Sequence, residues 1–179
     1  MLALPSQKFS DIEKSLSEIK KLNIPHISYY SLILEEGTRL YEAHKKSPLN
    51  FPDEDEDRKM YHYVVRELEK IGIDQYEISN FAKKGFECRH NLTYWKLKDY
   101  LSFGLSASSN IKNLRYRNFS DFKNYYEALD KNEKPIEFSE TLSKTDRMNE
   151  FIMMGLRLRS GIDLGEFKDR FEEDFLKLY

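Results

Sequence analysis

A histidine, two asparagines, two tyrosines and the only tryptophan and cysteine of the chain gather between residues 76 and 95. They lie in two stretches, Tyr76–Ala82 with the letters YEISNFA and Cys88–Trp95 with the letters CRHNLTYW. Neutral imidazole can ligate iron, and aromatic side chains with polar tips can border a flat, partly apolar molecule. This grouping therefore suits a planar ligand such as a tetrapyrrole. The alternative is that the same side chains form the hydrogen-bonded edge of a core.

Six blocks of the chain, in the same order, resemble signatures of the HemW-type haem chaperones. These are radical S-adenosylmethionine (SAM) proteins, often described as similar to oxygen-independent coproporphyrinogen III oxidase. The family signatures YEISNFA and HNxxYW match Tyr76–Ala82 and His90–Trp95, and the resemblance covers essentially all 179 residues. The other matching blocks are Leu4–Gln7, His26–Thr38, Tyr100–Ala107 and Phe151–Leu158.

The chain lacks the CxxxCxxC motif that holds the iron–sulfur cluster in this family. Cys88, its one cysteine, cannot supply the three thiolates that a SAM-activating [4Fe–4S] cluster requires. The resemblance therefore implies that this chain is the C-terminal part of a longer protein, truncated at both ends. SAM and the cluster would belong to the full-length protein. We expect this chain alone to bind no cluster and to be inactive as an enzyme.

The composition is typical of a globular protein, with 34% charged and 40% hydrophobic residues. The 29 basic and 31 acidic residues give a net charge of −2, which does not favour nucleic acid as a partner. No apolar run approaches the roughly 18–20 residues that span a bilayer. We expect a cytoplasmic protein without a membrane span. Its candidate partners are haem or porphyrin, a haem-acceptor protein and a second copy of the chain.

The spacing of apolar residues predicts six helices, and Ser10 with Glu13 and Asp53 with Glu56 predict two capping boxes. The helices are expected at about 10–22, 39–44, 53–72, 121–131, 143–158 and 163–179. His90–Trp95 is expected to be a loop or a short helix. Runs rich in aromatic and β-branched residues predict strands at His26–Leu34, Asp74–Asn80 and Tyr100–Ser106. This alternation of strands and helices is the α/β pattern.

The resemblance implies that residues 1–134 are the C-terminal portion of a partial (βα)6 radical SAM barrel. In such barrels the loops after the strands face the active site. The polar stretch Pro135–Ser143 marks a boundary, and 135–179 is expected to be an incomplete helical domain that resembles the start of a winged helix.

Four positions are expected to face SAM: Gln7, Ala82 and Ser108 through the resemblance to related enzymes, and Glu77 through strand alternation. The Gln7 amide can donate to and accept from a ligand, but it can equally stabilise its own turn. Strand alternation makes Glu77 a ligand-facing candidate, since a carboxylate inside a barrel needs a partner. Ala82 would act through its backbone. Ser108 replaces the histidine of most chaperones, but a contact with SAM is still expected there.

The positions expected to meet haem or substrate are Tyr30, Glu35, His90, Asn91, Tyr94 and Trp95. His90 is the candidate iron ligand, because imidazole in its neutral form binds iron. Asn91 would orient His90 or bind a propionate, and Tyr94 and Trp95 would border the porphyrin. Glu35 can instead cap its loop, and Cys88 is an alternative thiolate ligand for iron.

The favoured hypothesis is a fragment of a radical SAM haem chaperone that acts in porphyrin metabolism. The enzymatic alternative is oxidative decarboxylation of coproporphyrinogen III by the full-length protein. The non-enzymatic alternative is a protein-interaction module that uses the helical pair at 143–179. The HNxxYW segment argues for the chaperone branch.

Overall fold

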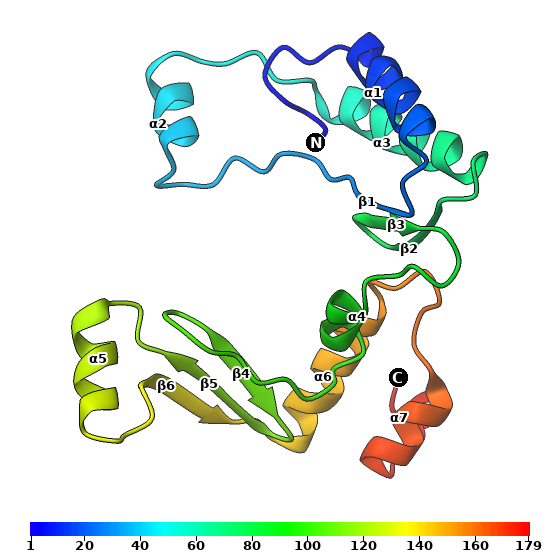
Figure 1. Ribbon diagram of the computed structural model, residues 1–179. Coiled ribbons are helices and arrows are strands. Elements are labelled where there is room, and N and C mark those ends of the chain that lie inside the picture. Colours follow the sequence, from blue (N-terminus) through cyan, green and yellow to red (C-terminus); the bar gives the residue numbers. More distant parts are fainter. The chain divides into compact units, whose positions relative to one another are not determined.

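The computed structural model describes residues 1–179, which form two compact units, Met1–Cys88 (unit 1) and Arg89–Tyr179 (unit 2) (Figure 1). Unit 1 contains α1 (Phe9–Leu22), β1 (His26–Ser28), α2 (Arg39–Lys46), α3 (Glu54–Glu69), β2 (Asp74–Glu77) and β3 (Asn80–Ala82). Unit 2 contains α4 (Arg89–Trp95), β4 (Ser108–Ile111), β5 (Leu114–Asn118), α5 (Phe122–Asp130), β6 (Ile136–Thr141), α6 (Lys144–Gly155), α7 (Leu164–Phe171) and α8 (Phe175–Leu178).

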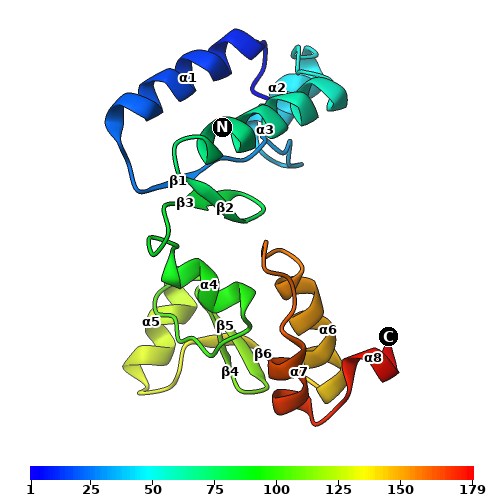
Figure 2. The same cartoon turned by 90° about the vertical axis from the view of Figure 1, so that its right-hand side faces the viewer.

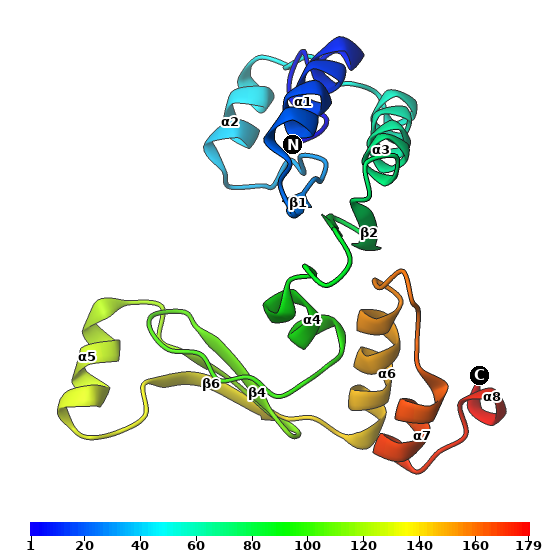
Figure 3. The same ribbon diagram turned by 45° about the vertical axis from the view of Figure 1, so that its right-hand side comes forward.

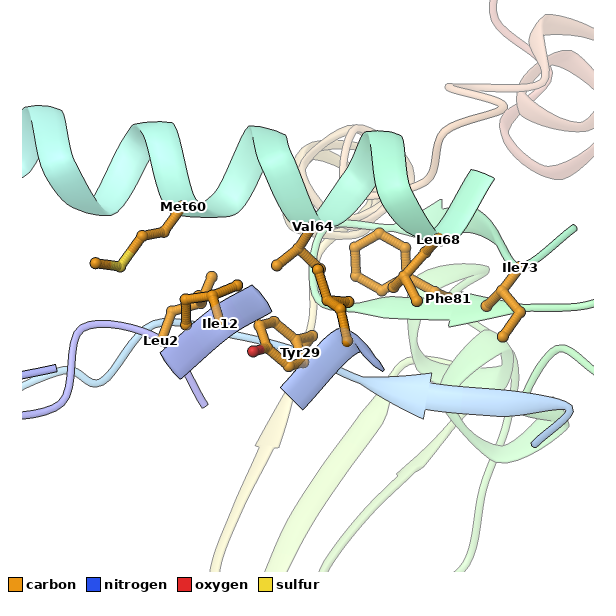
Figure 4. Packing of buried hydrophobic residues seen from close by; sticks show 9 residues of the cluster. Leu2, Ile12, Tyr29, Met60, Val64, Leu68, Ile73 and Phe81 are labelled. Carbon is orange, nitrogen blue, oxygen red and sulfur yellow. The ribbon is translucent and has the colours of Figure 1, made fainter. Parts of the chain in front are cut away.

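The core of unit 1 forms where α1 packs against α3, beside an antiparallel sheet of order β1-β3-β2. Val64 and Leu68 stand one helical turn apart on α3 and are fully buried. Figure 4 shows the buried side chains of α3 pointing toward Leu2, Ile12 and Tyr29. The complete cluster is Leu2, Ile12, Leu16, Tyr29, Met60, Val64, Leu68, Ile73 and Phe81.

Capping fixes where these two helices begin. Asp53 precedes α3 and accepts from the backbone N–H of Glu56 at 2.8 Å, while Glu56 accepts from the Asp53 N–H at 3.3 Å. The predicted capping box at Asp53 is therefore confirmed. The box predicted at Ser10 is wrong, because α1 starts one residue earlier and Asp11 accepts from the backbone before the helix at 3.0 Å.

The strand predicted at His26–Leu34 is shorter in the structure, where only β1 pairs within the sheet. Beyond β1 the chain pairs with the N-terminal segment instead. The N–H of Leu2 donates to the Tyr30 carbonyl and the N–H of Leu32 donates to the Leu2 carbonyl, both at 2.9 Å. This isolated bridge is parallel, whereas the named strand pairs are all antiparallel.

Unit 2 combines an antiparallel sheet of order β4-β5-β6 with a helical part. Helix α5 connects β5 to β6 (Figure 3). Helix α7 lies alongside α6 (Figure 2), and their contact buries a cluster rich in phenylalanine. The buried members are Leu97, Met148, Phe151, Phe167 and Phe171.

The fold is therefore mixed α/β with two small antiparallel sheets, and no barrel is seen. The strand predicted at Tyr100–Ser106 is wrong, and three strands that the sequence analysis did not predict follow it, β4, β5 and β6. Gly104 and Ser106 have φ angles of +98° and +57°, so the backbone turns where a strand was expected. The helix predicted at 163–179 is also interrupted, because Glu172 adopts a φ of +57° after α7.

Along the chain, the first compact unit ends at Cys88 and the second begins at Arg89. The sequence analysis predicts a boundary after residue 134 instead. Strand β6 lies beyond that position and pairs with β5 before it. The division into 1–134 and 135–179 stays a prediction.

Candidate functional site

The candidate iron ligand lies on α4, the short helix that opens unit 2. His90 is exposed, and its Nε2 atom lies 3.0 Å from the hydroxyl of Tyr94, one helical turn further on. The two rings meet edge to face with centroids 4.9 Å apart, and Tyr94 meets Tyr100 in the same way at 4.7 Å. Burial raises the pKa of the Tyr100 hydroxyl, and the neighbouring Tyr94 raises it further. The helix thus presents an accessible imidazole beside two phenol rings.

Trp95 and Asn91 lie on a different side of α4, because successive residues of a helix are about 100° apart. The guanidinium of Arg157 covers the Trp95 ring at 4.3 Å from its centroid. Trp95 also lines a pocket of about 420 Å³ with Phe151 and Gly155 of α6. The Nε1 atom of Trp95 is buried and has no hydrogen-bond partner. The structure therefore brings His90 together with Tyr94, but it does not bring all four predicted haem residues into one pocket.

Glu77 is buried in unit 1, with 1% of its surface exposed. Its Oε1 atom accepts from the backbone N–H of Ser79 at 2.9 Å and from the side-chain amide of Asn80. The amide oxygen of Asn80 accepts in turn from the hydroxyl of Ser28 at 2.5 Å. These bonds connect β1, β2 and β3, and they give Glu77 partners within the sheet.

The side chain of Gln7 closes the turn in which it lies. Its Oε1 accepts from the Leu4 N–H at 3.1 Å, and its Nε2 donates to the Met1 carbonyl at 3.2 Å. Gln7 also lines a groove of about 580 Å³, together with Phe9 and residues at the start of α3. The geometry thus gives Gln7 the turn-stabilising role that the sequence left open as its alternative.

Of the remaining predicted positions, one is buried and three are exposed. Ala82 is buried in the central strand β3. Tyr30 is 47% exposed, and Glu35 is exposed while its backbone carbonyl accepts from the Thr38 hydroxyl at 2.7 Å. Ser108 is exposed at the start of β4.

A second histidine–tyrosine pair, which the sequence analysis did not single out, lies in unit 1. The Nε2 atom of His26 is 3.0 Å from the hydroxyl of Tyr76, and that hydroxyl accepts from the backbone N–H of Cys88 at 3.3 Å. His26 and Tyr76 are each the first residue of a block that resembles the family. Comparing the two blocks could therefore have pointed to this pair.

The side chains present do not fit an iron–sulfur cluster, because Cys88 is the only thiol. Groups of three or more histidine, cysteine or carboxylate side chains placed to hold a metal ion do not occur. No helix is long and apolar enough to cross a membrane.

Comparisons with known proteins identify relatives of this chain. The family model for the HemN C-terminal domain matches residues 142–179. The chain is 37% identical to the heme chaperone HemW of Lactococcus lactis subsp. lactis, over 99% of this chain and 46% of the relative. It is 34% identical to the heme chaperone HemW of Bacillus subtilis, over 96% of this chain and 45% of the relative.

Among solved structures, the coproporphyrinogen III oxidase HemN from Escherichia coli, a radical SAM enzyme, is similar with a TM-score of 0.77. The match covers 99% of this chain and 43% of that chain at 16% identity, so it establishes a likeness of fold. The chain thus spans about half the length of the curated relatives that it matches.

Proposed function

We propose that this chain, which belongs to the HemW- and HemN-like family of radical SAM proteins, contributes the haem-binding elements of a haem chaperone. The observation that carries the proposal is the exposed imidazole of His90, held on α4 within a match that covers nearly the whole chain. Haem is the cargo in this proposal, and the chain supplies an iron ligand and aromatic surface.

His90 would bind iron through a ring nitrogen, as neutral imidazoles commonly do. If that nitrogen is Nε2, the hydrogen bond with the Tyr94 hydroxyl has to open first. The rings of Tyr94 and Tyr100 would then border the porphyrin, while Asn91 would reach a propionate. The ring of Trp95 would border the porphyrin from the neighbouring pocket that it lines.

The same proposal keeps Gln7, Glu77, Ala82 and Ser108 as the positions that would meet SAM in the parent protein. Gln7 and Glu77 would have to exchange internal hydrogen bonds for contacts with the cofactor. The barrel would likewise be completed by the rest of the parent protein. Because one cysteine does not fit a cluster, we derive no radical chemistry for this chain.

A haemin titration followed by the Soret band tests the role of His90. We expect weak binding by the chain and a loss of at least about tenfold in His90→Ala, equivalent to about 1.4 kcal/mol. His62→Ala is the matched control, since it removes another exposed histidine, on α3 of unit 1. Circular dichroism of each variant establishes that the fold is retained.

Equal affinities of the folded wild type and His90→Ala would overturn the proposal. Cys88→Ser is titrated in parallel, because a thiolate also binds haem iron. Loss of binding in Cys88→Ser with no change in His90→Ala would assign the ligand to the thiolate instead.

A further inference from the structure

A groove of about 680 Å³ lies in unit 2, and its lining includes neither His90 nor Trp95. Its walls come from the segment after α4, the β4–β5 turn, the start of α6 and the end of α7. Leu97, Leu142 and Phe171 give it an apolar floor. Five basic side chains also line it, against the single carboxylate of Asp99: Lys98, Lys112, Lys144, Arg147 and Arg170. We call this the basic groove.

Three basic side chains of this groove form no ion pair, Lys98, Lys112 and Arg147, and of these Arg147 alone is partly buried. Arg147 lies on α6, and its hydrogen-bond partner is the amide oxygen of Asn110, at the long distance of 3.4 Å. The acidic side chains nearby are engaged elsewhere. The pairs are Glu150 with Arg115 at 2.6 Å, Glu173 with Lys144 at 2.6 Å, Glu166 with Arg170, and Asp99 with the backbone N–H of Lys112 at 2.7 Å.

The surroundings of Arg147 favour an anion beside it. Burial lowers the pKa of its guanidinium, Asp99 and Glu150 raise it, and Arg170 and Arg115 lower it again through repulsion between like charges. Asn110, which is 2% exposed, accepts the hydrogen bond of the guanidinium. A guanidinium presents a planar fork of donors that matches carboxylate and phosphate groups in a bidentate way.

We propose that the basic groove binds a small anionic ligand, with a carboxylate or phosphate group on Arg147 and a partly apolar body on Leu97, Leu142 and Phe171. The volume of the groove lies within the range of about 300–1,000 Å³ that small-molecule sites occupy. The exposed side chains of Lys98 and Lys112 flank the opening and strengthen the attraction. This site uses none of the residues assigned to haem, and it stands independently of that function.

Isothermal titration with three probes tests the site and separates its two chemistries. Phenyl phosphate and benzoate compare phosphate with carboxylate, while inorganic phosphate lacks the apolar body. We expect saturable binding of at least one aromatic probe in the millimolar range, at least about threefold tighter than inorganic phosphate, and weaker at higher salt. Absence of saturable binding by all three probes would overturn the proposal.

Arg147→Gln should weaken binding of the favoured probe by at least about tenfold, since charge-assisted bidentate bonds are strong. Arg147→Lys should lose about threefold, because it keeps the charge but not the fork. Arg159→Gln is the control and should change affinity by less than about twofold, since it removes the same charge from an exposed position outside the groove.

Lys112→Gln covers the case in which Arg147→Gln fails to fold. Its side chain is exposed on the β4–β5 turn, so the fold should survive while binding falls by about two- to threefold. Unchanged affinity in both folded groove variants, or an equal loss in Arg159→Gln, would show that the groove is not the site.

Discussion

The hydroxyl of Tyr94 lies 3.0 Å from Nε2 of His90, one of the two ring nitrogens through which this imidazole would bind iron in the proposed function. Because this hydrogen bond is exposed and joins residues one helical turn apart, it forms locally and competes with water. A hydrogen bond of this kind contributes about 0.5–1.5 kcal/mol, and an exposed one lies at the low end. The pair is thus a modest barrier to ligation, of a size that a single substitution can reveal.

Tyr94→Phe removes this competing hydroxyl and keeps most of the aromatic surface. We expect haemin affinity to rise by about two- to threefold, in the direction opposite to His90→Ala. Tyr126→Phe on α5, which removes another hydroxyl from an exposed tyrosine of unit 2, is the control. A fall in affinity for Tyr94→Phe would mean that its hydroxyl orients His90 rather than competing for it.

The two histidine–tyrosine pairs show which part of a site local sequence can predict. His90 and Tyr94 are four residues apart, so helical geometry alone brings them together. His26 and Tyr76 are fifty residues apart, and only the pairing of β1 and β2 with β3 makes them neighbours. Glu77 is a third case. Strand alternation predicts the face of the strand on which its side chain lies. Its hydrogen bonds to Ser79 and Asn80 depend on the irregular pairing of β2 with β3, which the sequence does not predict.

Among the elements, α1 and α3 are joined by a charged cluster around Glu67. Lys20 of α1 lies 2.8 Å from one Glu67 oxygen, and Lys70 lies 2.5 Å from the other. Hydrogen bonds from Lys20 and then Lys70 lower the pKa of Glu67 to about 2. A depressed carboxylate pKa adds stability above the unfolded-state value, and this is lost as pH falls through the folded-state value.

Glu67→Gln should therefore destabilise the chain near neutral pH, and the difference from wild type should disappear as pH falls from about 5 to about 2. Urea unfolding measured at several pH values tests this. Glu13→Gln removes a carboxylate from the exposed side of α1 without touching either lysine and serves as the control. A difference from wild type that stays constant down to pH 2 would contradict the assignment.

At this scale the helices were easier to predict than the strands. For α3, the apolar spacing and the Asp53 cap point to the same element, and both are found. Strands β4 and β5 carry few apolar residues, and ion pairs of Arg115 with Glu140 and Arg117 with Glu137 join β5 to β6. Their turn contains Lys112 at a φ of +54°, a conformation that usually favours glycine. Neither the composition of the two strands nor the residues of the turn therefore predict this hairpin.

For the molecule as a whole, each unit depends on its own core. Phe167 is fully buried at the centre of the helical part of unit 2, with ring centroids 5.8, 5.0 and 5.3 Å from Phe151, Phe171 and Phe175. Phe167→Ala should cost about 3–5 kcal/mol, through lost burial and the cavity left behind. That is a large share of the roughly 5–15 kcal/mol by which domains are stable.

Hydrogen exchange followed by mass spectrometry measures where the loss falls. We expect Phe167→Ala to raise exchange in α6 and α7, while α1 and α3 keep their protection because their core contains none of these residues. Phe122→Ala, at a position 65% exposed on α5, should change stability by at most about 0.5 kcal/mol. An equal rise in exchange throughout the chain would show that the cores are not independent.

Large apolar side chains also remain exposed in both units. Ile33, Phe103 and Leu176 are 76%, 87% and 75% exposed, and the outer edges of β1 and β2 have no strand beside them in the sheet. Exposed apolar surface and open strand edges favour association. We therefore predict that the chain self-associates at micromolar concentration, with an apparent mass that rises with concentration above the 21.4 kDa of one copy.

Light scattering coupled to gel filtration measures this directly. The double variant Ile33→Ser, Phe103→Ser should shift the chain toward one copy, because it removes the two most exposed of these side chains and leaves both cores untouched. Lys14→Ser, a change at an exposed polar position on α1, should leave the association as it is. High salt separates the possible driving forces, since it screens ion pairs but strengthens apolar association. A wild-type mass that stays at one copy over the whole concentration range would show that these side chains do not act as an interface.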